Sequence, residues 1–189
     1  MTESWRCFVA VPVGQEFRAA LAASVGEWRG RSDLAGLRWS EPEAWHLTLA
    51  FLGDVPAPDL PRLTAALEAA AGGHEAGELR TSGLGGFPST SRARVAWCGL
   101  ADESGRLNPL ADSVREGLAL PPGEPFRAHV TLARARSAPV DLRRWVESAR
   151  VPDVRAPVDR VELVRSHLGQ GPARYEVLAG VPLGAPARV

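Results

Sequence analysis

The sequence of 189 residues contains no lysine, and all 22 of its basic residues are arginine. This absence excludes chemistry that needs a lysine amine, such as a Schiff base, a covalent nucleotidyl-lysine or a Walker-type phosphate loop. Acidic residues also number 22, so the formal net charge is zero. Because the chain as a whole has no basic field for gripping a long nucleic acid, we expect any RNA or DNA partner to be held locally.

Cysteines and long apolar runs are also scarce. Cys7 and Cys98 lie in separate apolar stretches without the spacing of a metal or redox motif, so we expect small core residues in a reducing compartment. The first residues lack the basic and apolar regions of a signal peptide, and no run approaches the length of a membrane span. We therefore expect a cytoplasmic, monomeric protein without a membrane partner. The length predicts one domain over 1–189, without a linker or second domain.

Hydrophobic patterning predicts alternating strands and helices. The predicted strands are 5–12, 37–39, 45–51, 78–84, 93–100, 126–134, 158–167 and 174–181, and the predicted helices are 15–28, 58–71, 106–120 and 141–149. Residues 83–91 are rich in Gly, Pro and Ser and are expected to form a loop. We expect residues 121–123 to break the helix before them, and a turn at 169–172.

A His-x-Thr pattern occurs twice, as His46-Leu-Thr48 and His129-Val-Thr131. In a strand, residues two apart share a face, so each histidine and its threonine point one way while the apolar residue between them faces the core. With four His and six Thr in the chain, random placement predicts roughly 0.1 such pair. A second copy is therefore unexpected by chance and indicates that the two motifs act together.

The two motifs occupy equivalent places in the two halves of the chain. Each half is predicted to run strand, helix, His-x-Thr strand, helix, strand, which indicates a weak internal repeat. We predict an α+β fold with two pseudo-twofold-related lobes, mainly antiparallel sheets around a central cleft, and helices on the outside. The polar face of each motif favours antiparallel sheets open on one side. The strict alternation of predicted strands and helices is also compatible with a doubly wound parallel sheet.

Two histidines that face each other across a cleft can act as general acid and general base, because each can hold either protonation state near neutral pH. The hydroxyls of Thr48 and Thr131 can hydrogen-bond the non-bridging oxygens of a phosphate between them. Arg127, on the face of His129, and Arg134, three residues after Thr131, would supply positive charge. This arrangement suits in-line displacement at phosphorus and needs neither a metal nor another cofactor.

Competing uses of these residue types are weaker. One His-x-Thr motif alone would more often be structural; its duplication favours a site. We interpret His74 as a solvated loop residue and His167 as structural, with cleft lining as the lesser alternative. A zinc site would need a third ligand, and no HxH, HExxH or Cys/His cluster is present.

Tryptophans and two further arginines have simple structural interpretations. We assign Trp39, Trp45, Trp97 and Trp145 to the core, although Trp39 precedes the first motif and can alternatively stack on a nucleobase. Arg92 and Arg94 flank the glycine-rich segment and are interpreted as solvated charge, with phosphate contact as the less favoured alternative.

The paired motifs resemble the signatures of the two-histidine (2H) phosphoesterases. The sequence is most similar to the LigT/ThpR branch, the RNA 2′,3′-cyclic phosphodiesterases once named 2′-5′ RNA ligases. The resemblance covers nearly the whole chain. It is carried by Arg6–Val11, His46–Gly53, Ser91–Leu100, Phe126–Arg134 and Arg174-Tyr175. One departure is Ala128, which stands before the second histidine where the branch usually has proline.

The resemblance implies metal-independent hydrolysis of a terminal RNA 2′,3′-cyclic phosphate to a 2′-phosphomonoester. The partner would be the 3′ end of a tRNA-like or short RNA. The implied roles are proton donor for His46, proton acceptor for His129, and substrate binding for Thr48, Thr131, Arg127 and Arg134. The reverse reaction, 2′-5′ ligation, would be secondary because water is always present.

Three alternatives remain at this point. The near symmetry of the two motifs leaves the order of donor and acceptor open. The substrate can also be a small cyclic nucleotide or cyclic ADP-ribose phosphate, which a neutral protein would suit. The protein can further be a non-catalytic RNA-end-binding protein, although both intact motifs argue against that. Comparing a mononucleotide cyclic phosphate with a tRNA-half substrate would separate an RNA substrate from a small nucleotide.

Overall fold

The computed structural model describes residues 3–121, 125–167 and 173–185. The described chain forms an α+β fold around one nine-stranded sheet, in the order β7-β4-β5-β6-β3-β1-β8-β9 with β2 also paired to β6. The strands are β1 (Ser4–Pro12), β2 (Leu37–Trp39), β3 (His46–Pro56), β4 (Gly77–Phe87), β5 (Val95–Ala101), β6 (His129–Ala135), β7 (Arg155–Val158), β8 (Arg160–His167) and β9 (Arg174–Pro182). The helices are α1 (Gln15–Arg29), α2 (Leu60–Ala71), α3 (Leu107–Gly117) and α4 (Arg143–Ser148).

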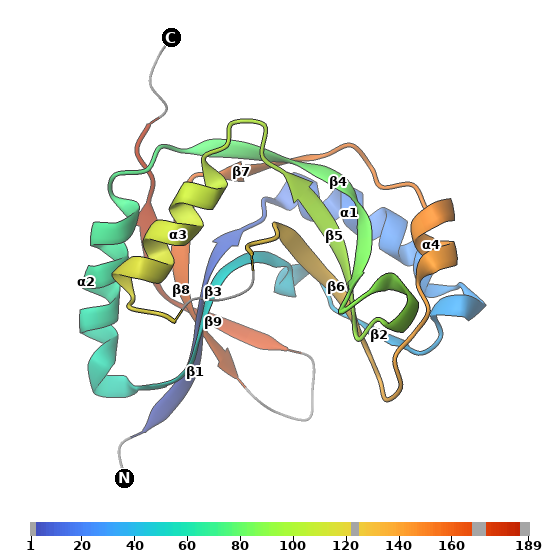
Figure 1. Ribbon diagram of the computed structural model, residues 1–189, viewed down its shortest axis with the longest axis horizontal. Coiled ribbons are helices and arrows are strands. Elements are labelled where there is room, and N and C mark those ends of the chain that lie inside the picture. Colours follow the sequence, from blue (N-terminus) through green and yellow to red (C-terminus); the bar gives the residue numbers. More distant parts are fainter. Residues whose placement is uncertain (1–2, 122–124, 168–172, 186–189) are drawn as a thin grey trace.

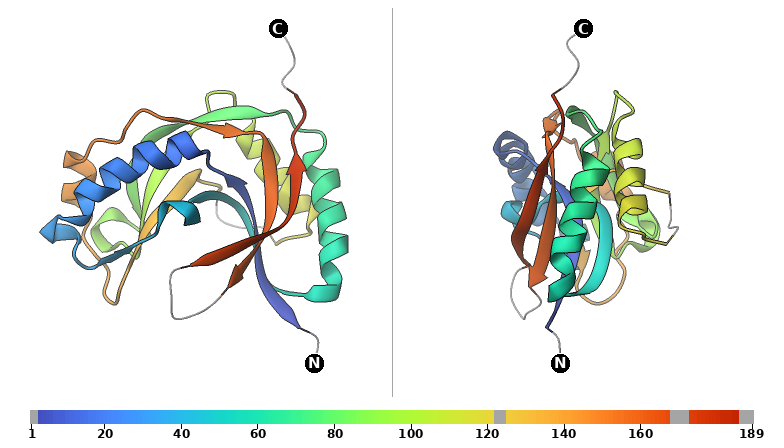
Figure 2. Two further views of the ribbon diagram at one scale, coloured as in Figure 1. Left: turned by 180° about the vertical axis from the view of Figure 1, so that it is seen from behind. Right: turned by 90° about the vertical axis from the view of Figure 1, so that its left-hand side faces the viewer.

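The sheet curls into an arch, with α2 and α3 at one end and α1 and α4 at the other (Figures 1 and 2). All pairings between these named strands are antiparallel. The predicted α+β class with antiparallel strands and outer helices is therefore confirmed, and the two predicted lobes share one sheet.

The lobes differ from the two halves of the chain. β5, β4 and β7 lie outward from β6, whereas β1, β8 and β9 lie outward from β3. The last two strands thus join the first, as the red strands beside the blue one in Figure 1 show, and β4 from the first half joins the second lobe. Each half therefore contributes strands to both lobes, and the two His-x-Thr strands, β6 and β3, are neighbours where the lobes meet.

The predicted loop at 83–91 is wrong over its first five residues, because β4 continues to Phe87. Gly85 pairs with Trp97 of β5, and a Cβ at Gly85 would lie only 2.1 Å from the indole. This glycine serves close packing rather than a turn. The sequence pattern also gave no sign of β7, a short strand at the end of the sheet order whose Pro157 is tolerated at an edge.

Other predicted boundaries differ by a few residues. α3 ends at Gly117, and α4 covers only Arg143–Ser148. The carboxylate of Asp141 accepts a hydrogen bond from the Arg143 amide, so Asp141 lies before α4 rather than in it. The predicted turn at 169–172 and part of the predicted break at 121–123 lie outside the described residues.

The core lies between the helices and one face of the sheet. Both cysteines are buried and unpaired, as predicted. Apolar residues from each helix pack against the sheet, including Phe17, Leu21, Leu67, Leu110, Val114 and Trp145. Burial of these side chains fixes the position of β3 and β6 and leaves their other face for polar groups. Among the described residues, no helix is long and apolar enough to cross a membrane.

Candidate active site

The two His-x-Thr motifs meet at a single cross-strand pair, Leu47 opposite Val130. Both side chains are fully buried on the core face. One step along this antiparallel pair brings His46 toward Thr131, and one step the other way brings Thr48 toward His129. The predicted meeting of the two motif faces is therefore present, with each histidine flanked by the threonine of the other strand.

Each motif is followed by a β-bulge. In β3, Thr48 and Ala50 pair with adjacent residues of β1, which leaves Leu49 as the extra residue. In β6, Thr131 and Ala133 pair with adjacent residues of β5, which leaves Leu132 as the extra residue. A bulge inserts one residue and reverses the alternation of faces after it.

The bulges bring Phe51 and Arg134, five residues after each histidine, to the site face. A regular strand would have turned both toward the core. Arg134 is exposed, and its positive charge lowers the pKa of His46 and of His129. Phe51 is 67% exposed, with its ring centroid 6.2 Å from that of Phe8.

His46 is held by its backbone and by aromatic packing. Its Nδ1 lies 2.9 Å from the carbonyl oxygen of Ala44, so the Nδ1–H donates and Nε2 is left for other chemistry. The ring stacks on Phe8 at 4.7 Å and meets Tyr175 edge-on at 5.1 Å. These contacts fix the tautomer and the orientation of the imidazole.

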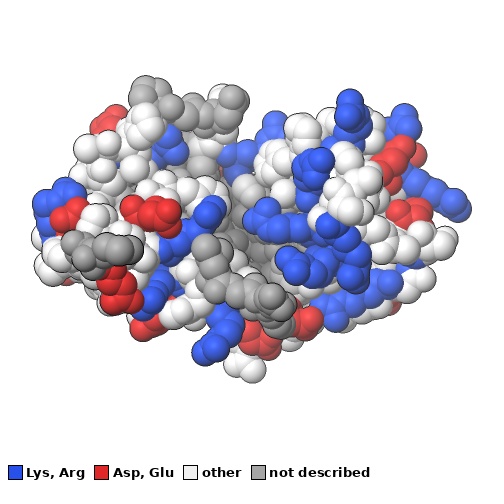
Figure 3. All heavy atoms as spheres, turned by 90° about the horizontal axis from the view of Figure 1, so that it is seen from below, with Lys and Arg blue, Asp and Glu red and all other residues white. Residues whose placement is uncertain are grey.

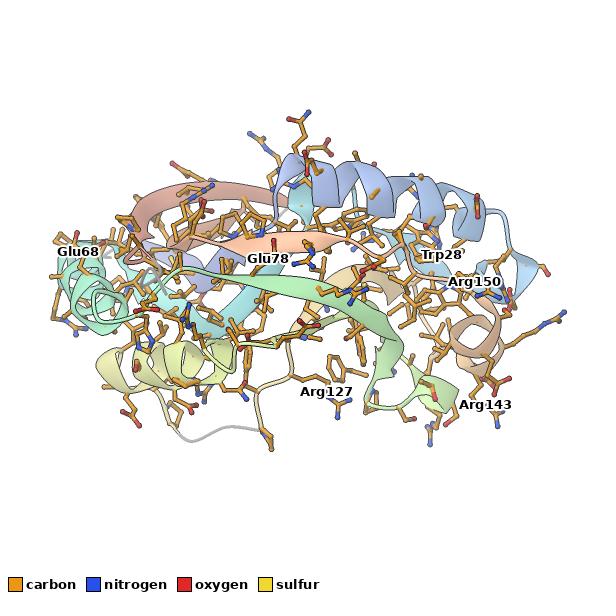
Figure 4. The ribbon with its side chains drawn as sticks, turned by 90° about the horizontal axis from the view of Figure 1, so that it is seen from above. Trp28, Glu68, Glu78, Arg127, Arg143 and Arg150 are labelled. Carbon is orange, nitrogen blue, oxygen red and sulfur yellow. The ribbon has the colours of Figure 1, made fainter. Side chains whose placement is uncertain are left out.

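His129 is held in the same way by different residues. Its Nδ1 lies 2.7 Å from the carbonyl oxygen of Arg127, two residues earlier as at His46. The ring meets Phe87 edge-on at 5.0 Å and Trp97 at 6.1 Å. The Arg127 guanidinium lies over these two aromatic rings, at 5.8 and 5.9 Å from their centroids. In Figure 4, Arg127 lies on the opposite side of β4 from Trp28.

Both histidines are easier to keep neutral than a free imidazole. Burial lowers the pKa of His46 to about 4; the hydrogen bond to Ala44 opposes this effect, while the charges of His129, Arg134 and Arg18 add to it. Burial also lowers the pKa of His129, and the charges of Arg127 and Arg134 lower it further, against the hydrogen bond to the Arg127 carbonyl. The site therefore combines two neutral imidazoles with the positive charge of nearby arginines, and an anionic substrate would neutralise that charge.

Sequence reasoning missed three side chains beside His46. Arg18 of α1 is close enough for its charge to lower the pKa of His46, and its buried Nε has no hydrogen-bond partner among the described residues. Phe8 packs on the histidine, and Phe51 is exposed beside it. The alternating pattern of the strands gives no information on Arg18, which belongs to a helix. Phe51 could not be placed on the site face from the sequence, because regular alternation without the bulge would turn it toward the core.

The other histidines have structural partners. His74 lies in a loop as predicted but is partly buried rather than solvated, with Nε2 2.9 Å from the Ser113 hydroxyl. His167 pairs with Glu176 at 2.9 Å across β8 and β9. Trp39 packs on Trp28 and Trp145, in agreement with its assignment to the core. The described part of the chain has no group of three His, Cys, Asp or Glu arranged to hold a metal ion.

Curated relatives share most of this chain. An RNA 2′,3′-cyclic phosphodiesterase of Geobacillus stearothermophilus is 34% identical over 95% of the chain, which spans 58% of that relative's length. A protein of the same name from Thermus thermophilus is 35% identical over 92% of the chain and 87% of the relative.

Solved structures show the same fold. The protein TT0787 of Thermus thermophilus superposes with a TM-score of 0.75 at 30% identity, over 95% of this chain and 98% of that one. Escherichia coli LigT complexed with 3′-AMP gives 0.73 at 26% identity, over 96% and 99%. The family model described as LigT like Phosphoesterase matches residues 11–97 and 99–173. The resemblance predicted from the two motifs is thus confirmed, and the chain belongs to the LigT-like phosphoesterase family.

Proposed function

We propose that this protein hydrolyses the 2′,3′-cyclic phosphate at the 3′ end of RNA to a 2′-phosphomonoester, with His46 and His129 as acid and base. The observation that carries this proposal is the junction at Leu47 and Val130, which sets two imidazoles and two hydroxyls on one face of the sheet. The relatives named RNA 2′,3′-cyclic phosphodiesterase support the substrate class.

In the proposed reaction, His129 is the base. Its Nδ1–H is engaged by the Arg127 carbonyl, so Nε2 carries the lone pair that takes a proton from water. The water oxygen attacks phosphorus in line with the ribose 3′ oxygen. The depressed pKa of His129 supports this role, because it keeps the imidazole neutral.

His46 is the proposed acid. In the substrate complex it carries a second proton on Nε2, which it gives to the 3′ oxygen as the phosphorus–oxygen bond breaks. The 2′ ester remains, so the product is a 2′-phosphate with a free 3′ hydroxyl. Since burial lowers the pKa of free His46 to about 4, its protonation depends on the substrate: the negative phosphate favours the imidazolium and raises this pKa.

The remaining side chains bind the substrate. Thr48 and Thr131 would donate hydrogen bonds to the two non-bridging oxygens, whose negative charge grows in the transition state. Arg134 and Arg127 would balance that charge. The exposed rings of Phe51 and Tyr175 offer a surface on which the terminal base can stack. The same groups can run the reaction backwards with a 5′ hydroxyl in place of water, which would give a 2′-5′ linkage.

The test is to treat the protein with EDTA and incubate it with a short RNA that ends in a 2′,3′-cyclic phosphate. Identification of the phosphate position then reads out the leaving group. A 2′-phosphate is expected, formed at the same rate with and without EDTA. A 3′-phosphate would contradict the assignment of the 3′ oxygen as leaving group, and the absence of any reaction would contradict the activity.

A further inference from the structure

Arginines gather at one edge of the site, and they carry an inference that rests on the proposed function. We propose that the RNA chain on the 5′ side of the cyclic phosphate crosses this edge and that its internal phosphates contact it. The edge, here called the arginine edge, consists of Arg38, Arg94, Arg134 and Arg136. Seen from below, basic side chains gather on the lobe at the right of Figure 3, beside the middle of the molecule.

The arginine edge contains a like-charge pair. Arg38 of β2 lies directly opposite Arg134 of β6 in the antiparallel register, so both side chains leave the same face. Like charges directly opposite in a sheet are destabilising. Because Arg134 lies on the site face, an anion bound there would remove this cost, and a phosphate group of a nucleic acid matches the fork of the arginine guanidinium.

Arg94 and Arg136 are exposed and lie beside this pair, just before β5 and just after β6. The Ala135 amide donates to the Arg94 carbonyl, and the Arg94 guanidinium donates to the Ser137 carbonyl at 3.3 Å. The Arg136 Nε donates to the Leu37 carbonyl at 3.2 Å. Backbone carbonyls hold these two side chains at the ends of β2 and β6 without neutralising their charge.

The arginine edge is distinguished by its place: its four arginines lie on or beside the adjacent strands β2, β5 and β6, whereas other arginines without a carboxylate partner in the described part of the chain, such as Arg62 and Arg150, lie elsewhere. Among the described residues, no carboxylate lies within 4.0 Å of a guanidinium nitrogen of the arginine edge. Elsewhere, carboxylate partners are present for Arg29, Arg31, Arg80, Arg106, Arg143, Arg155, Arg160 and Arg165. The protein is neutral overall, yet the positive charge of this described edge is not neutralised by the protein itself.

The chemistry of the substrate sets the direction of the chain. A 2′,3′-cyclic phosphate ends the RNA, so every other phosphate lies on its 5′ side. The exposed side chains on the β3 side include Phe51, Tyr175 and Val177, whose apolar surface suits a base rather than phosphates. The arginine edge lies instead on the β6 side, next to Arg134, and would carry the upstream phosphates. This surface would distinguish an oligonucleotide from a mononucleotide.

The experiment compares kcat/KM for a mononucleoside 2′,3′-cyclic phosphate and for a six-nucleotide RNA with the same terminal nucleotide. In the wild-type protein, the longer substrate should be preferred about tenfold or more at low salt, and the preference should decline with salt. The double variant R38Q/R94Q should lose most of the preference, with the log–log salt slope reduced by about 0.7 for each phosphate contact removed.

A matched variant, R62Q/R150Q, removes the same charge from α2 and from the segment after α4, and both of these arginines are exposed. It should retain the wild-type preference and salt slope. Equal losses on both substrates, or no loss in R38Q/R94Q, would overturn the inference while leaving the activity intact. If the wild-type protein hydrolysed neither substrate, the proposed function itself would fail. Thermal unfolding of R38Q should show equal or higher stability, since the variant removes the like-charge pair.

Discussion

The two His-x-Thr strands, β3 and β6, have the same local backbone arrangement but different side chains around it. In both, the histidine Nδ1 bonds to a carbonyl two residues earlier, and a bulge follows the threonine. Five residues after the histidine, however, β3 presents Phe51 and β6 presents Arg134. The histidine of β3 packs on Phe8 and Tyr175, whereas an arginine lies over the aromatic neighbours of the other.

Under the proposed function, this difference would let a nearly symmetric frame hold an asymmetric substrate. The repeated backbone would provide two equivalent proton-transfer groups and two hydroxyls around one phosphorus. The apolar side would then hold the base, and the cationic side would hold the negatively charged chain. The assignment of acid and base would follow from which way the substrate lies, rather than from the motifs themselves.

The largest expected effect comes from removing either histidine. H46A and H129A should each lower kcat for a 2′,3′-cyclic phosphate by about 10²–10⁴-fold, because each loses one proton transfer. H74A serves as the control, since this histidine pairs with Ser113 away from the motifs. Near-normal turnover in either motif variant would break the claimed equivalence of the two strands.

Removal of one threonine hydroxyl should cost less. T48V and T131V keep the side-chain shape and lose a hydrogen bond to a charged oxygen, worth about 1.5–3 kcal/mol, or about 10–100-fold in kcat/KM. Similar losses in both variants are expected from the equivalent positions of the two residues. T64V, in α2, is the matched control. A loss confined to one variant would mean that only one strand holds the phosphate.

The apolar side is tested at Phe51. F51A should raise KM for a nucleotide substrate about tenfold, because base stacking on an aromatic side chain is worth about 1–3 kcal/mol. F51L keeps apolar bulk without the ring and should recover only part of the loss. If steady-state kinetics of F51A matched the wild-type protein, the base would lie elsewhere.

The smallest effect is a shift in pH dependence. The base must be neutral, so activity falls below its pKa; the acid must be charged, so activity falls above its pKa. Both pKa values lie below the ordinary 6.5 in the free protein, that of His46 at about 4. The kcat/KM optimum should therefore lie below pH 6.5, and the kcat optimum higher, because bound phosphate raises both pKa values.

The variant R18Q tests whether nearby positive charge contributes to this pH dependence. Loss of the Arg18 charge removes one of the causes that lower the pKa of His46, so that pKa rises and the limb near pH 4 should move upward. Superimposable kcat and kcat/KM profiles with an optimum above pH 7 would contradict the electrostatic account.

The arrangement of the two motifs was more predictable from the sequence than the order of the strands in the sheet. Period-two alternation was enough to place His46 and Thr48 on one face, since the apolar neighbours Leu47 and Val130 had to be buried. It could not reveal the bulges at Leu49 and Leu132, because leucine suits a bulge and a regular strand equally. It therefore gave no reason for Arg134 to share the face of His129.

The features that the sequence did not predict depend on contacts between segments far apart in the chain. The glycines after Leu79 in β4 look like a turn until the indole of Trp97 covers Gly85. The exchange of β4 and of β8 between the lobes depends on contacts between distant segments, for which local pattern carries no signal. Equal charge totals likewise concealed the arginine edge, because charge pairing is a property of the folded surface.

A change of leaving group tests directly whether the two equivalent histidines divide the acid and base roles. In a cyclic phosphate with sulfur in place of the 3′ bridging oxygen, the thiolate leaves without help from an acid, since a thiol pKa of about 8.5 is far below that of an alcohol. H46A should then hydrolyse this substrate at close to the wild-type rate, while H129A stays slow. Rescue of H129A with continued failure of H46A would contradict the assignment.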